Sequence, residues 1–331
     1  MVWKRYFAIL WGQESLKERK RRLLWQSLAL FIATRKMISN MHDSQQQQRK
    51  GYSELLVDFY RGLCPKDLFF SDNNVTPMFY VDDLGDDLIT VSYRAADLDQ
   101  RMLDVIYGFR LAEFVARGMM SATLAERTAL VKEPDDGTEV HVLTFDMTGR
   151  LVGYIGLLGL NIYGSGLQLD DPDRPLFPVE VAHGVELLSK FSAPHIDTSN
   201  VYEIKRFIRA GNISDRKIRD RIPWHLLLGL GRTVTDQLTN LKLVVGDGRK
   251  NGTLQHLKLL GFVPMVVEGT CPKLSEDSLM APSYDVLDPA VPFVSWLPNN
   301  FLGKLTLLED FLGRSQSGNW QLDIIKSLAE T

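Results

Sequence analysis

Alternating apolar and polar positions predict a set of short strands in the middle of the chain. Leu88 to Tyr93, Glu139 to Asp146 and Leu151 to Leu160 have the period of two that is typical of strands. Between the last two, Met147 to Arg150 has the residue types of a tight hairpin turn. Ala95 to Met119 instead repeats its apolar residues at helical spacing. This part of the chain therefore reads as a strand, a helix and a pair of strands.

Residues 201–262 continue the alternation of strand and helix. VYEIKRFIR predicts a strand, and a basic turn leads into a helix, PWHLLLGLGRTVTDQL, that we expect to begin near Pro223. NLKLVV then predicts a strand and NGTLQHLKLLGF a short helix. The remaining predicted elements are strands at Phe262–Glu268 and Tyr284–Leu297 and helices at Leu305–Phe311 and Trp320–Leu328. The pattern indicates an α/β protein.

The chain before residue 85 is helical in pattern and basic at its start. Tyr52 to Leu63 predicts a helix that Pro65 ends. Residues 1–36 hold nine Lys and Arg (4, 5, 17, 19 to 22, 35 and 36) against Glu14 and Glu18. We therefore expect an N-terminal helical extension, residues 1–84, and an α/β domain, residues 85–331. The basic helices could contact an anionic membrane surface, or they could pack their Trp/Leu face on the domain as a cap.

Composition excludes several classes of protein. With 45% hydrophobic and 24% charged residues, the chain of 331 residues is globular, and its net charge of −3 gives no reason to expect nucleic acid. Cys64 and Cys271 form no CxxC pair, which favours a reducing, cytoplasmic location. No apolar run approaches the roughly 20 residues that cross a bilayer. The histidines lack metal-ligand spacing, so we expect no metal site. Neither the GxSxG motif of serine hydrolases nor a Walker glycine loop for phosphate occurs.

Glu203 is the first candidate for catalysis. In VYEIKRF the alternation places Val201, Glu203 and Lys205 on one face of the strand, with Arg206 on the other. An acid in such a strand must be solvated, paired or functional, because burying a lone carboxylate is costly. It could act as a general base for an attacking amine, or it could be a salt-bridged glutamate on an edge strand.

A basic stretch follows Glu203 and is the second candidate. Cations with exposed helix N–H groups suit a phosphate or phosphopantetheine, or the acidic surface of a carrier protein; a solvated basic loop is the alternative. Gly229-Leu230-Gly231, further along, more often marks close helix packing. Besides Lys205 and Arg206, the cations of the stretch are Arg209, Arg216, Lys217, Arg219 and Arg221.

These residues resemble the acyl-homoserine-lactone synthases and the related N-acyl amino acid synthases, two branches of the GNAT-like acyltransferase fold. Arg110-Leu-Ala-Glu-Phe114 is similar to the family's Arg-x-x-x-Phe, and Glu203-Ile-Lys-Arg206 to its Glu-x-x-Arg strand. The acids Glu133, Asp135 and Asp136 loosely match an acidic stretch between the two. The chain departs from the family at Met120, where members have Trp, and in lacking an Arg near Leu157.

The resemblance implies a GNAT-like mixed sheet flanked by helices, with Glu203 as the base. Arg206 and Arg110 would organise charge around the amine, and Phe114, Asp135 and Asp136 would contact it. Strands near 156–160 and 202–208 would splay to admit the thioester. The acyl chain would lie in an apolar pocket formed by Leu151–Leu160, which includes Leu158, by Leu226–Leu230 and by Phe293.

The function that the resemblance implies is transfer of a fatty acyl group from acyl carrier protein or coenzyme A to an amine, with no tightly bound cofactor. Its most specific form is synthesis of an N-acyl-homoserine lactone, a quorum-sensing signal, from S-adenosylmethionine. Two alternatives stay open: an N-acyl amino acid synthase that uses a free amino acid, and a non-catalytic module of the same fold that binds carrier protein.

Overall fold

A computed structural model describes residues 51–71, 75–82, 84–123, 136–160, 166–270, 272, 274, 278, 280–284, 289–314 and 320–330. The chain divides into two compact units, Met1–Tyr52 and Ser53–Thr331. The predicted helices within residues 1–36 lie outside the described residues, so the following concerns the second unit.

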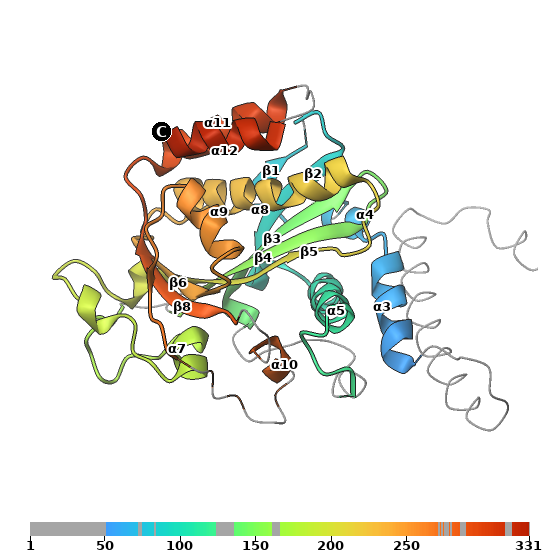
Figure 1. Ribbon diagram of the computed structural model, residues 1–331. Helices are drawn as coiled ribbons and strands as arrows, with labels where there is room; N and C mark the ends of the chain where they lie inside the picture. Colours follow the sequence, from blue (N-terminus) through green and yellow to red (C-terminus); the bar gives the residue numbers. More distant parts are fainter. Residues whose placement is uncertain are drawn as a thin grey trace, which may run out of the picture. The chain divides into compact units, whose positions relative to one another are not determined.

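The described strands form one eight-stranded mixed sheet (Figure 1). Its order is β1-β2-β3-β4-β5-β6-β8-β7, and every neighbouring pair is antiparallel except β5 and β6. The strands are β1 Phe79–Val81, β2 Leu88–Arg94, β3 Glu139–Asp146, β4 Leu151–Gly159, β5 Val201–Arg209, β6 Leu243–Gly248, β7 Met265–Val266 and β8 Val291–Trp296.

The parallel pair follows from its connection, because a crossover between parallel strands needs an intervening helix. Helix α8 (Arg216–Gln237) supplies this crossover between β5 and β6. The antiparallel run from β2 to β5, followed by this crossover, confirms the predicted GNAT-like mixed sheet flanked by helices.

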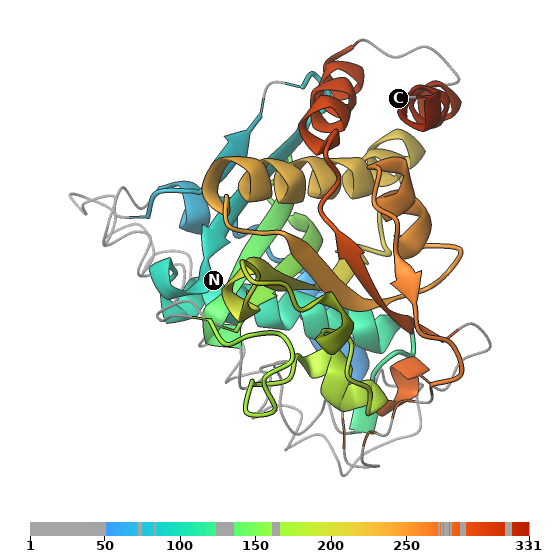
Figure 2. The same cartoon turned by 90° about the vertical axis from the view of Figure 1, so that its left-hand side faces the viewer.

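Helices cover both faces of the sheet. In Figure 1, α8 and α9 (Thr253–Leu259) lie on one side and α5 (Gln100–Ala116) and α7 (Pro178–His183) on the other. Figure 2 shows α8 running across the strands, with α11 (Phe301–Gly313) packed on its outer side. The other described helices are α3 Tyr52–Gly62, α4 Lys66–Phe70, α10 Ala281–Tyr284 and α12 Trp320–Glu330, and short 3-10 turns lie at Ala95–Asp97, Asp136–Thr138, Ser189–Phe191 and Thr198–Asn200.

Helix α8 begins seven residues earlier than predicted. Its N-cap is Asp215, whose carboxylate accepts hydrogen bonds from the N–H groups of Lys217 and Ile218, and Pro223 lies inside the helix. The prediction placed the start at Pro223 because proline suits a first turn, but the capping carboxylate fixes the actual start.

The two glycines of α8 mark close packing, as predicted. A Cβ at Gly229 would lie 2.7 Å from Thr90 Cγ2 and 2.8 Å from Val142 Cγ1 in the sheet, and one at Gly231 would meet Leu305 of α11. The missing side chains therefore let α8 approach both the sheet and α11.

Near the C-terminus the strands are shorter than predicted and the helices agree. The strand predicted over Tyr284–Leu297 is wrong at its start, because Tyr284 ends α10 and β8 begins only at Val291. Only Met265–Val266 of Phe262–Glu268 forms a strand, whereas α11 and α12 confirm the two predicted helices. Within the described residues, no helix has the length and apolar character required to span a bilayer.

Candidate active site

Charged side chains are buried on the face of the sheet turned away from α8. Glu139 of β3 pairs with Leu158 of β4, and Leu158 pairs with Glu203 of β5, so their side chains form one row across that face. Their exposed fractions are 1%, 0% and 5%. Helix α5 lies on this side of the sheet (Figure 1). Because a buried carboxylate needs partners, the surroundings of the two glutamates define the candidate site.

A bulge at Arg206 overturns the simple alternation predicted for β5. Arg206 has a φ of +58°, and the register of β4 and β5 shifts between Tyr154 and Gly156. Lys205 and Arg206, predicted on opposite faces, therefore both reach Glu139 Oε1, at 3.4 Å from Nζ and 2.5 Å from Nη1. Burial alone would raise the pKa of Glu139, but Arg206 and Lys205 hold it well below its usual range.

Glu139 is a site residue that the sequence prediction missed. The predicted acids were Glu133, Asp135 and Asp136; Glu133 and Asp135 lie outside the described residues, and Asp136 opens a 3-10 turn. The available signal was an acid at the first position of a predicted buried strand. Its buried pairing with Arg206 shows that Arg206 is held in place within the sheet.

Helix α5 places Arg110 in the same network. Arg110 is fully buried, and its guanidinium lies 5.2 Å from the centre of the Tyr107 ring. Burial lowers the pKa of His141 to about 4, and the charge of Arg110 acts in the same direction. His141 Nδ1 is 3.1 Å from the hydroxyl of Tyr154, which donates to Glu139 at 3.1 Å. Phe114, the other predicted α5 residue, is also buried.

Glu203 has little contact with solvent, and Val179 N donates a hydrogen bond to its Oε2 at 3.3 Å. Burial raises the pKa of Glu203 to about 8, the negative charge of Asp247 adds to the rise, and Lys205, the Val179 N–H and Arg206 oppose it. Glu203 is therefore mostly protonated at neutral pH and becomes a base just above it. A carboxyl group with such a pKa suits general acid–base chemistry.

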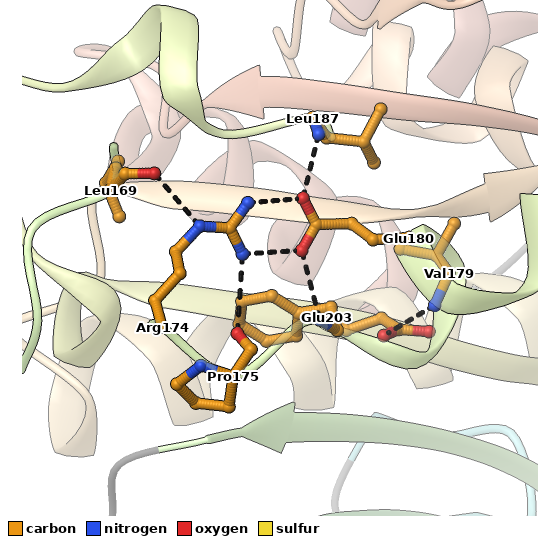
Figure 3. A network of polar contacts seen from close by, with 8 residues as sticks. Leu169, Arg174, Pro175, Val179, Glu180, Leu187 and Glu203 are labelled. Carbon is orange, nitrogen blue, oxygen red and sulfur yellow. Dashed lines mark hydrogen bonds and ion pairs between the residues drawn. The ribbon is translucent and has the colours of Figure 1, made fainter. Parts of the chain in front are cut away.

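A buried ion pair holds Val179 against Glu203 (Figure 3). Arg174 donates to both carboxylate oxygens of Glu180 at 2.8 and 2.7 Å, and to the carbonyl oxygen of Leu169 at 2.9 Å. Glu180 also accepts from the N–H groups of Phe177 and Leu187. Bidentate pairing of this kind fixes geometry, so the first turn of α7 is held in place beside Glu203.

The sheet opens between β5 and β6, next to Glu203. Their pairing runs from Val201–Leu243 through Glu203–Val245 to Ile204–Gly246, although β5 continues to Arg209. The prediction that segments 156–160 and 202–208 splay is wrong, since these are β4 and β5, which stay paired around the bulge.

A second polar cluster stands at this opening. Asp247 Oδ2 accepts a 2.5 Å hydrogen bond from the hydroxyl of Tyr284 and lies 3.5 Å from Nε2 of His183. None of the three was predicted, because they come from β6, α10 and α7 and share no sequence motif.

The predicted basic residues divide into two groups. Arg216, Lys217 and Arg219 lie in the first turn of α8, and Arg216 is paired with Asp220 at 3.3 Å. Arg209 ends β5. Arg221, in contrast, is buried and paired with Asp86. Its charge is therefore not part of the surface formed by Arg209, Arg216, Lys217 and Arg219.

Further cations lie near Arg209. Arg117, which follows α5, donates to the carbonyl oxygen of Arg209. Burial lowers the pKa of Arg117, and the charges of Arg209, Arg61 and Arg249 also lower it, while Glu113 opposes them. Four arginines thus gather where β5 ends.

Of the three segments predicted to form an apolar pocket, Leu151–Leu160 contributes Leu160 to a groove, whereas Leu226–Leu230 and Phe293 do not line it. The latter side chains are packed in the core, with exposures from 0 to 3%, because α8 buries one face on the sheet and the other on α11. The open groove, of about 340 Å³, is lined by Leu160, Leu176, Pro178, Val181, Ala182 and Leu274. Its wall includes Pro178, the residue before Val179, whose N–H donates to Glu203. Among the described residues, no group of three or more His, Cys, Asp or Glu side chains could hold a metal ion.

No protein-family model and no curated protein matches the sequence. Solved structures similar to the chain include the CoA-dependent acyl-homoserine lactone synthase BjaI with SAM and isopentyl-CoA, at 18% identity and a TM-score of 0.42, covering 72% of this chain and 98% of that one. The AHL synthase LasI has 16% identity and a TM-score of 0.41, with coverages of 64% and 91%. An acyl-CoA N-acyltransferase from Pseudomonas aeruginosa has 14% identity and a TM-score of 0.33, and the match covers 62% of this chain and 98% of that one. At these identities, a functional assignment depends on the residues of this chain.

Proposed function

We propose that the protein is an N-acyltransferase that moves an acyl group from a thioester to an amine, with Glu203 as the base. One observation carries the proposal: a nearly buried carboxyl group with a pKa of about 8 stands where β5 and β6 cease to pair. We expect this placement to give a reacting group access to the base between the two strands, with helices covering both faces of the sheet.

The reaction requires the acceptor ammonium to lose a proton before it can attack. Ionised Glu203 takes this proton, the amine nitrogen forms a bond to the thioester carbonyl carbon, and the carbon–sulfur bond then breaks. The nitrogen of the tetrahedral intermediate gives its second proton to the departing thiolate. Backbone N–H groups at the opening would stabilise the oxyanion. Glu203 then releases its proton to solvent, so one proton is produced for each amide formed.

The donor is an acyl thioester of carrier protein or coenzyme A. Arg209, Arg216, Lys217 and Arg219 lie at the end of β5 and the start of α8, and they suit the phosphate of a phosphopantetheine or an acidic carrier surface. The apolar groove beside α7 suits the acyl chain, because its lining is aliphatic and its volume lies within the range of ligand sites.

The specific acceptor that we propose is S-adenosylmethionine. After acylation of its amine, its carboxylate would attack the side-chain carbon bonded to the sulfonium. The carbon–sulfur bond would break, so that 5′-methylthioadenosine leaves and an N-acyl-homoserine lactone forms. The resemblance of Arg110, Phe114, Glu203 and Arg206 to the motifs of the acyl-homoserine-lactone synthases supports this acceptor. In this chain, Arg110 and Arg206 both act on buried Glu139.

Mass spectrometry of extracts from cells that express the chain, followed by assays of purified protein with acyl carrier protein and CoA donors, tests the proposal. Detection of acyl-homoserine lactones would support S-adenosylmethionine as the acceptor. Detection of acyl amino acids would show instead that the acceptor is a free amino acid. Glu203→Gln should abolish turnover, while Glu186→Gln, at an exposed position after α7, should leave it unchanged. Full activity of Glu203→Gln would refute the base, and absence of any acylated amine with the unaltered protein would refute the function.

A further inference from the structure

The polar cluster of Asp247, Tyr284 and His183 has no place in the assignment above. Tyr284 donates to Asp247 at 2.5 Å, and His183 Nε2 lies 3.5 Å from the same oxygen. On the other side of the imidazole ring, Nδ1 is 3.0 Å from the hydroxyl of Thr270. The rings of His183 and Tyr284 meet edge to face, with centres 5.7 Å apart. Tyr284 therefore orients Asp247 by a hydrogen bond, and the imidazole of His183, bound to Thr270, lies next to the same oxygen.

The position of Asp247 relates it directly to Glu203. Glu203 pairs with Val245, and Asp247 follows Val245 by two residues, so both carboxylates point to the same face of the sheet as diagonal neighbours. The strands cease to pair at Gly246, one residue before Asp247. The side chain of Asp247 is 27% exposed, whereas Glu203 is 5% exposed. A molecule that enters between β5 and β6 would thus meet Asp247 before Glu203.

Charged and polar groups surround Asp247 and Glu203 from β5, α7 and α10. Lys205 and Arg206 project from β5 and are paired with Glu139. His183 faces the pair from α7 and Tyr284 from α10, and the N–H of Val179 binds Glu203. The groups that contact Asp247 and Glu203 on the α7 and α10 side are thus a hydroxyl, an imidazole and a backbone amide. A carboxylate in these surroundings suits a ligand that brings a positive charge and several N–H donors.

We propose that Asp247, oriented by Tyr284 and His183, binds the ammonium group of the acceptor and presents it to Glu203. The ligand class is a primary ammonium, and the inference rests on the N-acyl transfer proposed above. One N–H of the ammonium donates to Asp247, and a second points at Glu203, which accepts its proton before the nitrogen attacks the thioester. Asp247 contacts the substrate, while Tyr284 and His183 are positioning residues.

Kinetics of Asp247→Asn test the inference, with the amine that the unaltered protein acylates as the varied substrate. We expect the KM for the amine to rise at least tenfold, the loss expected for one charge-assisted hydrogen bond, and the KM for the thioester to change less than twofold. Asp247→Glu should recover part of the loss. Tyr284→Phe should shift the amine KM in the same direction by a smaller factor. Asp173→Asn, at an exposed position before α7, is the matched control and should change neither constant.

The pH profile gives an independent readout that a merely structural role would not move. Removal of the Asp247 charge should shift the limb of the rate profile that belongs to Glu203 to lower pH, because the repulsion between the two carboxylates disappears. An unchanged amine KM and profile in both Asp247→Asn and Tyr284→Phe, with active unaltered protein, would overturn the inference and leave the proposed function intact. An unaltered protein that acylates no amine would overturn both.

Discussion

Replacement of Glu203 by glutamine should make the folded protein less sensitive to pH. Glutamine keeps the size of the side chain, and its carbonyl oxygen can still accept the hydrogen bond from Val179 N. It removes a carboxyl group whose pKa the fold raises from 4.5 to about 8. The comparison of Glu203→Gln with the unaltered protein therefore isolates the free energy of holding this carboxyl group in a buried position.

The sign of the effect follows from proton binding in the two states. Between pH 4.5 and about 8, the folded protein keeps a proton on Glu203 that the unfolded chain releases. Stability therefore falls as the pH rises through this window. Each pH unit corresponds to about 1.4 kcal/mol. Relative to the unaltered protein, Glu203→Gln should therefore gain roughly 3 to 5 kcal/mol in free energy of unfolding between pH 4.5 and pH 8.

Urea unfolding, followed by circular dichroism at several pH values between 5 and 8.5, measures this quantity. The free energy of unfolding of Glu203→Gln minus that of the unaltered protein should grow steadily with pH. A constant offset at all pH values would report only how well the amide fits, so the slope is the test. Glu186→Gln should show no such slope. A flat difference for Glu203→Gln would refute the conclusion that Glu203 is buried in a protonated form.

Other variants test the packing, the network and the proposed binding surfaces. Glu139→Gln should destabilise the protein by about 3 to 5 kcal/mol above pH 5, because Arg206 and Lys205 would keep buried charges without their carboxylate; a loss under 1 kcal/mol in urea unfolding would contradict this. Gly229→Ala should cost about 1 to 3 kcal/mol through its contacts with the sheet, whereas Gly303→Ala in α11, where a Cβ meets nothing within 4 Å, should gain up to about 1 kcal/mol from helix propensity. Thermal unfolding of both glycine variants checks the contrast, and a gain at Gly229 would refute it. Val181→Asp in the groove should raise the KM for long-chain thioesters several-fold and leave short-chain donors unaffected, since each buried methylene is worth about 0.8 kcal/mol; equal effects on all chain lengths would remove the groove as the acyl site. Reversal of the exposed Arg216 to Glu should raise the KM for acyl carrier protein at low salt and lose its effect at high salt, and a salt-independent result would argue against carrier docking there.

Local sequence was sufficient for the elements that form from neighbouring residues. The strands Glu139–Asp146 and Leu151–Gly159 and the turn between them were predicted because alternation and turn chemistry act within a few residues. The glycines of α8 were identified as packing positions because glycine inside an apolar helical pattern marks a close approach of another segment. Glu203 was singled out because an acid in a strand of β-branched and aromatic residues conflicts with its surroundings, and this conflict is visible without a structure.

Tertiary contacts decided everything that depends on partners from distant segments. The bulge at Arg206 and its pairing with Glu139 join residues 67 positions apart, and no periodicity of β5 alone predicts them. Burial of Arg221 beside Asp86, and of Leu226 in the core, depends on which face of α8 meets the sheet.

The sequence by itself determined the α/β order, the hairpin and the candidate base, because periodicity and side-chain chemistry are properties of single segments. Only the tertiary structure placed Asp247, Tyr284 and His183 around one oxygen and opened the sheet beside Glu203. A pKa of about 8 arises in the same way, since it reflects how much water the folded chain excludes and which charges it brings near.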